Sequence, residues 1–273
     1  MLVLNSPAKI NLFLRVLQKR PDGYHEIASL FQTVSLCDRI HFRLSDEDLL
    51  TCNDINIPLG PTNLIWKAVD LFRRLTGKIT PLNIHLEKKI PIEAGLGGGS
   101  GNAATTLWAL NQLFGCAEEE STLTHWAAQI GSDIPFFFSH GTAYCTGRGE
   151  HVRDLPALPP QKLHLIKPRH GLSTALVYNN LQPVQLEQRN PQSILELFFL
   201  GKPVYFNDLE SSSFALMPTL ASLKQKLLTL QAGPVLMSGS GTAFICMQNP
   251  PLIEEEEWRT SCSFLKRQTG SWY

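Results

Sequence analysis

The stretch PIEAGLGGGSGN, residues 91–102, decides the fold, and it leads directly into a predicted helix over about 102–114. Five of the seven residues from 95 to 101 are glycines. Without side chains they bring backbone N–H groups close to a ligand, and the helix behind them directs its unsatisfied N–H groups and positive dipole end to the same place. This arrangement favours a bound polyphosphate, because five glycines in a plain helix-start loop would cost chain entropy without a reason.

Two other phosphate-binding loops fit this stretch less well. A P-loop needs a lysine after its last glycine, and none follows here. A relaxed dinucleotide-binding fingerprint spans residues 99–104, with acidic residues at 118–120. The preceding strand, 82–87, alternates in polarity, whereas a central parallel strand is apolar on both faces, and the acids stand where a helix begins. A dinucleotide-binding protein is therefore the weaker alternative.

The elements around this loop predict an α+β protein. Period-two alternation and apolar runs predict strands at 9–17, 27–36, 40–44, 82–87, 142–146 and 162–168, and two more around a small-residue turn in 234–247. Helical spacing predicts helices over 63–76, 102–114, 121–130, 193–200 and 219–231, and the acidic run 254–258 is expected to begin another. The strands come in groups with little regular βαβ alternation, which favours α+β. The proline-rich stretch 155–160 marks the expected seam between two domains, 1–155 and 156–273.

Composition excludes several classes of protein. The 273 residues are 43% hydrophobic and 18% charged, with a formal net charge of zero, so we expect a globular protein and no nucleic-acid partner. The six cysteines form no CxxC pair and the histidines no HExxH, so no zinc site is expected. There is neither a secretory leader pattern nor a run of ~20 apolar residues, so we expect a cytoplasmic protein that does not bind membranes.

The sequence resembles the GHMP kinases, whose three motifs appear here in the expected order. They are SPAKINL at 6–12, the glycine stretch above, and MSGSGTAF at 237–244. The resemblance implies an N-terminal domain like domain 2 of ribosomal protein S5, a ferredoxin-like C-terminal domain, and an active site in the cleft between them. It also implies transfer of the γ-phosphoryl group of ATP to an alcohol, with Mg²⁺ arriving together with ATP. We expect a monomer or weak homodimer.

Within that superfamily, a longer ordered series of motifs narrows the substrate. PAKINLFL, RPDGYHEI, LFQTV, GLGGGSGNAA and IGSDIPFF are most similar to the kinases that phosphorylate the 2-hydroxyl of diphosphocytidyl-methylerythritol in the non-mevalonate isoprenoid pathway. A mevalonate, phosphomevalonate or homoserine kinase is an alternative, but those substrates have no cytosine for the PDGYH block to stack on. A non-catalytic GHMP-like ligand-binding protein is a second alternative, against which the presence of Lys9 and Asp133 argues.

The resemblance also assigns roles to residues. It implies that Asp133 is the base that accepts the proton of the attacking hydroxyl and that Lys9 stabilises the carboxylate and the transferred group. From the residues alone, Asp133 also suits a turn and Lys9 a solvated strand edge. The ATP-binding candidates are Pro91, Ile92, Glu93, Ala94, Gly95, Leu96, Gly97, Gly98, Gly99, Ser100 and Gly101. The substrate-binding candidates are Asn11, Tyr24, His25, Tyr178, Gly239, Ser240 and Gly241.

One residue departs from the family pattern. Gly101 stands where the family commonly has a second serine, so a hydroxyl that contacts Mg²⁺ or phosphate in relatives is missing here. Ser100 or water would have to compensate for it. The sequence therefore assigns no protein ligand to a metal, and phosphate oxygens and water are expected to hold Mg²⁺.

Overall fold

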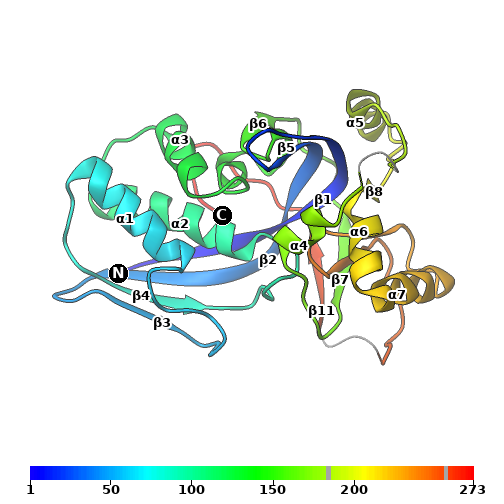
Figure 1. The fold of residues 1–273 in the computed structure, drawn as a ribbon. Coiled ribbons are helices and arrows are strands. Elements are labelled where there is room, and N and C mark those ends of the chain that lie inside the picture. The colour runs from blue at the N-terminus through cyan, green and yellow to red at the C-terminus, as the bar shows by residue number, and fades with distance from the viewer. Residues whose placement is uncertain (183–185, 255–257) are drawn as a thin grey trace.

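The computed structural model describes residues 1–182, 186–254 and 258–273, which form two sheets flanked by helices (Figure 1). The larger sheet has seven strands in the order β3-β4-β2-β1-β8, and β5 and β6 extend it from β2. Its strands are β1 (Leu2–Lys19), β2 (His25–Leu44), β3 (Leu49–Cys52), β4 (Leu82–Glu87), β5 (Thr142–Gly147), β6 (His151–Asp154) and β8 (Phe206–Asn207). Grouped strands with helices between the groups confirm the predicted α+β class.

The long hairpin of β1 and β2 is the frame of this sheet. The two strands pair antiparallel along nearly their whole lengths, with register shifts at Pro7/Ala8, Asn11/Phe13 and Val16/Gln18. The sequence predicted two strands, 27–36 and 40–44, where the structure has the single strand β2. The first register shift explains the difference, because a bulge lets a strand bend without ending its ladder.

Both faces of β1 are covered, so residues 6–16 are buried without interruption. Ile10 and Leu12 pack in one hydrophobic cluster with Leu163 and Leu165 of the second sheet. On the neighbouring strand, Phe31 belongs to a separate cluster with the N-terminal helices. The central strand therefore lies between two layers, and the polar side chains that it carries are removed from bulk water.

The helices α1, α2 and α3 lie together on one side of the large sheet (Figure 1). They are α1 (Leu64–Thr76), α2 (Gly98–Leu113) and α3 (Glu120–Ile130), followed by the short 3₁₀ helix η1 (Pro135–Phe138). Asn63 caps α1 by accepting a hydrogen bond from the Ile65 amide at 2.9 Å, and the helix ends at the left-handed Gly77, as predicted. The start of α2 differs from the prediction, since the helix begins four residues earlier and includes glycines in its first turn.

The second sheet is antiparallel, in the order β11-β7-β10-β9. Its strands are β7 (Lys162–Lys167), β9 (Val235–Met237), β10 (Phe244–Cys246) and β11 (Trp258–Ser263). The helices of this half are α4 (Thr174–Asn179), α5 (Pro191–Phe199), α6 (Leu209–Leu216) and α7 (Pro218–Thr229). The acidic run 254–258 lies partly outside the described residues, and the expectation of a helix is wrong at Trp258, which begins β11 because it pairs with Lys167 of β7.

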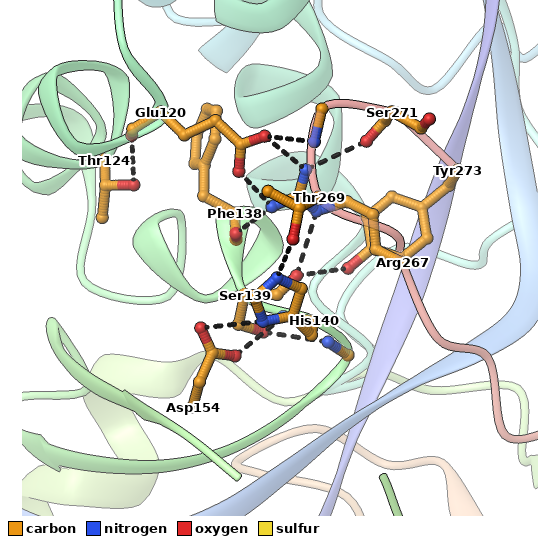
Figure 2. A network of polar contacts seen from close by, with 12 residues as sticks. Glu120, Thr124, Phe138, Ser139, His140, Asp154, Arg267, Thr269, Ser271 and Tyr273 are labelled. Carbon is orange, nitrogen blue, oxygen red and sulfur yellow. Dashed lines mark hydrogen bonds and ion pairs between the residues drawn. The ribbon is translucent and has the colours of Figure 1, made fainter. Parts of the chain in front are cut away.

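The C-terminal segment, residues 264–273, returns to the N-terminal half. Phe264 forms a bridge with Val34, and the Leu265 amide donates to the Thr33 carbonyl at 2.9 Å. Trp272 then stacks on Trp108 of α2 with ring centroids 5.3 Å apart. Figure 2 shows the polar contacts that this segment makes beside α3 and η1. The boundary between residues 155 and 156 stays a prediction.

No helix within the described ranges is long and apolar enough to cross a membrane.

Candidate active site

A cavity of about 940 Å³ opens between the two halves of the molecule, and most of the predicted site residues line it. It receives side chains from β1, the β1–β2 turn, the glycine stretch, the loop after α3, the β5–β6 turn, α4 and the β9–β10 turn. The predicted residues that line it are Lys9, Asn11, Tyr24, His25, Pro91, Ile92, Glu93, Ala94, Gly95, Leu96, Gly97, Gly98, Gly99, Ser100, Asp133, Tyr178, Gly239 and Ser240. Residues from distant parts of the sequence therefore line the same cavity.

Lys9 and Asp133, which both line this cavity, form an ion pair. Lys9 Nζ lies 3.1 Å from Asp133 Oδ2, with the lysine side chain 4% exposed and the aspartate side chain 31% exposed. The ammonium also lies 4.4 Å from the centre of the Phe31 ring. Because the lysine is buried and the carboxylate still reaches the cavity, the pair presents a charged oxygen to a ligand while its counter-charge stays out of water.

Asn11 completes this polar group on the same face of β1, as its two-residue spacing from Lys9 predicted. Its Oδ1 accepts a hydrogen bond from Lys9 Nζ at 2.8 Å. Its Nδ2 donates to Ser29 Oγ at 2.9 Å, and that hydroxyl in turn donates to the Phe13 carbonyl. The chain of hydrogen bonds fixes which end of the amide faces the lysine, so Lys9 and Asn11 are oriented before any ligand arrives.

The glycine stretch runs past Lys9 into the start of α2. Gly95 and Gly97 both adopt left-handed backbone angles, with φ of 74° and 67°. A Cβ on Gly97 would lie 2.8 Å from Lys9 Cγ, so only glycine lets the loop pass over the lysine stem. Gly98, Gly99 and Ser100 form the first turn of α2, where backbone N–H groups lack helical partners. This turn therefore has the free N–H groups that suit an anion, next to the loop that passes over Lys9.

The third motif packs directly on the glycine stretch, backbone against backbone. A Cβ on Gly95 would lie 1.8 Å from the Ser238 carbonyl oxygen, and one on Gly241 would lie 1.9 Å from the Gly95 nitrogen. The Ser238 hydroxyl donates to the Gly95 carbonyl at 3.0 Å, and the Ala243 amide donates to the Ala94 carbonyl at 3.2 Å. These contacts hold the β9–β10 turn beside Lys9, whose Nζ lies 3.6 Å from where a Cβ on Gly239 would be.

The far end of the cavity is aromatic. His25 and Tyr178 stack with centroids 5.2 Å apart, and burial followed by the charge of Lys19 lowers the pKa of His25. Burial and the charge of Asp133 raise the pKa of Tyr178, so its hydroxyl stays protonated. Tyr24 is 53% exposed, and the Arg148 guanidinium lies 4.8 Å from its ring centre. A flat, weakly polar ligand therefore finds ring faces and neutral hydrogen-bonding groups here.

Known proteins resemble this chain in sequence and in structure. The sequence model of the GHMP kinases N-terminal domain matches residues 63–141. A 4-diphosphocytidyl-2-C-methyl-D-erythritol kinase of Protochlamydia amoebophila is 49% identical over 99% of this chain and 92% of the relative. This chain belongs to that kinase family.

Two further members of the family extend the comparison. The chloroplastic/chromoplastic 4-diphosphocytidyl-2-C-methyl-D-erythritol kinase of Solanum lycopersicum is 46% identical over all of this chain and 73% of the relative. A crystal structure of 4-(cytidine 5'-diphospho)-2C-methyl-D-erythritol kinase superposes with a TM-score of 0.82 at 34% identity, covering 97% of this chain and 99% of that one. The GHMP kinase fold expected from the three motifs is therefore confirmed, and ATP is the phosphoryl donor that this family uses.

Two residues that the sequence assigned to the site do not line the cavity. Gly101 is buried, and a Cβ there would lie 2.7 Å from the Pro7 carbonyl oxygen and 3.3 Å from Phe137. A serine at this position would meet that carbonyl, so the departure from the family pattern at Gly101 fits the packing of this chain. Gly241 likewise faces the backbone of the first glycine stretch.

Sequence reasoning missed several lining residues. Lys88 lines the cavity beside Gly98, and its Nζ donates to Asp38 Oδ2 at 2.7 Å. Its position just before the glycine stretch is the sequence feature that could have indicated it. No sequence pattern indicated that Arg148 lines the cavity, because only the β5–β6 turn brings it to Tyr24. No sequence pattern indicated Thr174 either, whose hydroxyl lies 2.8 Å from that of Ser240.

Proposed function

We propose that this chain is a kinase that transfers the γ-phosphoryl group of ATP to the 2-hydroxyl of 4-diphosphocytidyl-2-C-methyl-D-erythritol, a step of the non-mevalonate (MEP) isoprenoid pathway. The observation that carries the proposal is the Lys9–Asp133 ion pair, 3.1 Å long, at the edge of a glycine-rich helix start. Relatives 43–49% identical over at least 99% of this chain are named as kinases of this substrate.

In this mechanism Asp133 is the general base. Its carboxylate accepts the proton of the 2-hydroxyl as that oxygen bonds to the γ-phosphorus, and the bond from the γ-phosphorus to the bridging oxygen breaks to release ADP. Lys9 pairs with the carboxylate at 3.1 Å and compensates charge on the transferred group. Asn11 holds the lysine in place through its 2.8 Å hydrogen bond and contacts the alcohol.

The glycine stretch binds the phosphates of ATP. Backbone N–H groups from 95 to 100 and the N-terminal end of α2 supply the donors, and Lys88 adds a cation beside them. Beyond them, Ile57 and Leu64 give the cavity an apolar wall for the adenine ring. Ser100 offers a hydroxyl oxygen of the kind Mg²⁺ prefers; Mg²⁺ arriving with ATP would neutralise phosphate charge there.

The aromatic end binds the cytidine. Tyr24 and Tyr178 offer ring faces for the cytosine, and His25, kept neutral by burial, offers one donor and one acceptor to the base edge. This end separates the proposed function from the mevalonate, phosphomevalonate and homoserine kinases, whose substrates carry no base. We also propose that the protein acts in the cytoplasm as a monomer or weak homodimer, without nucleic acid.

A coupled ADP-release assay across candidate alcohols tests this proposal. The purified protein is given ATP, Mg²⁺ and, in separate reactions, 4-diphosphocytidyl-2-C-methyl-D-erythritol, mevalonate, phosphomevalonate and homoserine. The cytidine substrate should be turned over with a kcat/KM far above the others. Faster turnover of another alcohol would overturn the substrate assignment, and no turnover of any alcohol would support a non-catalytic ligand-binding protein.

A further inference from the structure

The C-terminal segment places a buried cation, Arg267, in the N-terminal half, and none of the residues labelled around it in Figure 2 lines the cavity of the candidate site. Its side chain is 0% exposed, although it comes from a stretch near the end of the chain. The Arg267 amide donates to the His140 carbonyl at 3.1 Å, and the guanidinium lies 5.7 Å from the ring centres of Trp108 and Trp272. A charge this deep needs an unusually complete set of partners to be tolerated.

All five N–H donors of this guanidinium have an acceptor. Its Nε donates to the Ser139 carbonyl at 3.0 Å, and Nη2 donates to the Phe138 carbonyl. Its two terminal nitrogens also form a two-pronged ion pair with Glu120, in which Nη1 lies 3.1 Å from Oε1. The remaining donor of Nη1 reaches the Ser271 carbonyl at 2.9 Å. A lysine has three donors on one nitrogen and cannot satisfy this set.

The partners of Arg267 stand at the two ends of the segment that carries Asp133. Glu120 is the first residue of α3, which ends at Ile130, and Phe138 and Ser139 are at the end of η1. Asp133 lies between these two helices. One buried side chain therefore links the beginning of the segment to its end. The loop that carries the Asp133 carboxylate lies between these two fixed points.

The same segment is packed against the glycine stretch. Phe137 of η1 is fully buried, and its ring lies 3.3 Å from where a Cβ on Gly97 or Gly101 would stand. A displacement of η1 would therefore move Asp133 and the start of α2 relative to Lys9. Misplacement of a reacting group by about 1 Å costs ~10²-fold in rate, so the position of this segment matters to the reaction.

We propose that Arg267 is a positioning residue for phosphoryl transfer, which acts by fixing Asp133 against Lys9 from outside the cavity. The inference rests on the proposed role of Asp133. It explains why a charged residue near the end of the chain crosses to the N-terminal half and is buried there. It also gives the C-terminal segment a place in the catalytic reaction.

Arg267→Lys, measured with the full chain at a temperature well below its own Tm, is the first test. The kcat should fall by about tenfold, a part of the ~10²-fold cost of a 1 Å misplacement, while both KM values change less than about twofold. Arg73→Lys is the control for the loss of a two-pronged pair as such, since Arg73 forms one with Asp48 that is more exposed and does not line the cavity. That control should keep the wild-type kcat, and an equal loss in both variants would overturn the inference.

A double-mutant cycle separates positioning from general stabilisation. If Arg267 acts through Asp133, Arg267→Lys should have almost no further effect on the residual rate of Asp133→Asn. A tenfold loss in that background as well would overturn the inference while leaving the proposed function intact. Wild-type rates in Asp133→Asn itself would instead show that the proposed base is wrong.

Glu120→Gln serves as the milder variant if Arg267→Lys does not fold. It keeps the shape of the acceptor but removes its charge, so kcat should fall by about threefold with KM unchanged, less than the ~10²-fold cost of a full 1 Å displacement. A wild-type kcat in a folded Glu120→Gln protein would contradict the role of this ion pair.

Discussion

Gly95 and Gly241 lie so close that the nitrogen of the first stands 1.9 Å from where a Cβ on the second would be. One belongs to the glycine stretch before α2 and the other to the β9–β10 turn, so the contact joins the two halves of the chain at their backbones. Neither position admits a side chain. The relative placement of the glycine stretch and the β9–β10 turn thus requires that neither residue has a side chain.

Gly95→Ala should separate these loops. The new Cβ would lie 1.8 Å from the Ser238 carbonyl oxygen, and alanine also disfavours the φ of 74°. We expect a loss of about 3 kcal/mol or more in unfolding free energy, from overpacking together with the left-handed backbone, and a large loss of kcat. Chemical denaturation and steady-state kinetics measure the two effects.

Gly77→Ala is the control for the backbone contribution. Gly77 has a nearly identical φ of 71°, but nothing lies within 4 Å of its Cβ position. It should lose roughly 1–2 kcal/mol and keep its turnover. Equal losses in the two variants would mean that the contact between the loops is unimportant.

Tyr24→Ala tests the cytidine end of the cavity. The ring is half exposed beside Arg148, so its removal should not unfold the protein. Loss of one base–aromatic stack, about 1–3 kcal/mol, should raise the KM for the cytidine substrate and leave the KM for ATP unchanged. Tyr24→Phe keeps the ring and should restore most of the affinity; a parallel rise in both KM values would instead point to a general disturbance of the cavity.

The Glu120–Arg267 pair predicts a pH dependence of stability. Burial acts to raise the pKa of Glu120, but hydrogen bonds from Arg267 and the Gly270 amide outweigh it, and the pKa lies below its ordinary value of 4.5. A carboxyl with a lowered folded-state pKa stabilises the fold fully above its unfolded pKa and loses this contribution as the pH falls through the folded one. The Tm difference between wild type and Glu120→Gln should therefore be full above pH 4.5 and shrink below it.

Thermal unfolding of both proteins across this range measures the effect. A Tm difference that stays constant from neutral pH into the acid range would show that the charge of Glu120 does not contribute to the pair.

The sequence predicted those parts of the site that depend on local pattern. The two-residue spacing of Lys9 and Asn11 placed them on one face of a strand, and their side chains are hydrogen-bonded at 2.8 Å. The glycine stretch was expected to precede a helix, but α2 already begins at Gly98. Low intrinsic helix propensity misled the prediction there, since tertiary packing holds glycines in the first turn.

The parts that were missed depend on contacts between distant residues. β8 is two residues long and exists because Phe206 pairs with Phe13 of β1. β11 forms where an acidic run predicted a helix, because Trp258 pairs with β7. The burial of Arg267 follows from the return of the C-terminal segment, and no periodicity in residues 264–273 indicates it.

The pairing of Asp133 with Lys9 is the central feature of the proposed reaction, and turnover by Asp133→Asn with the cytidine substrate tests it most directly. The asparagine fills the same space but accepts a proton far more weakly, so nucleotide binding should persist while kcat falls by about 10²–10⁴-fold. Single-turnover phosphoryl transfer and ATP-analogue binding, measured on the same preparation, give both quantities. Wild-type turnover in this variant would contradict the account.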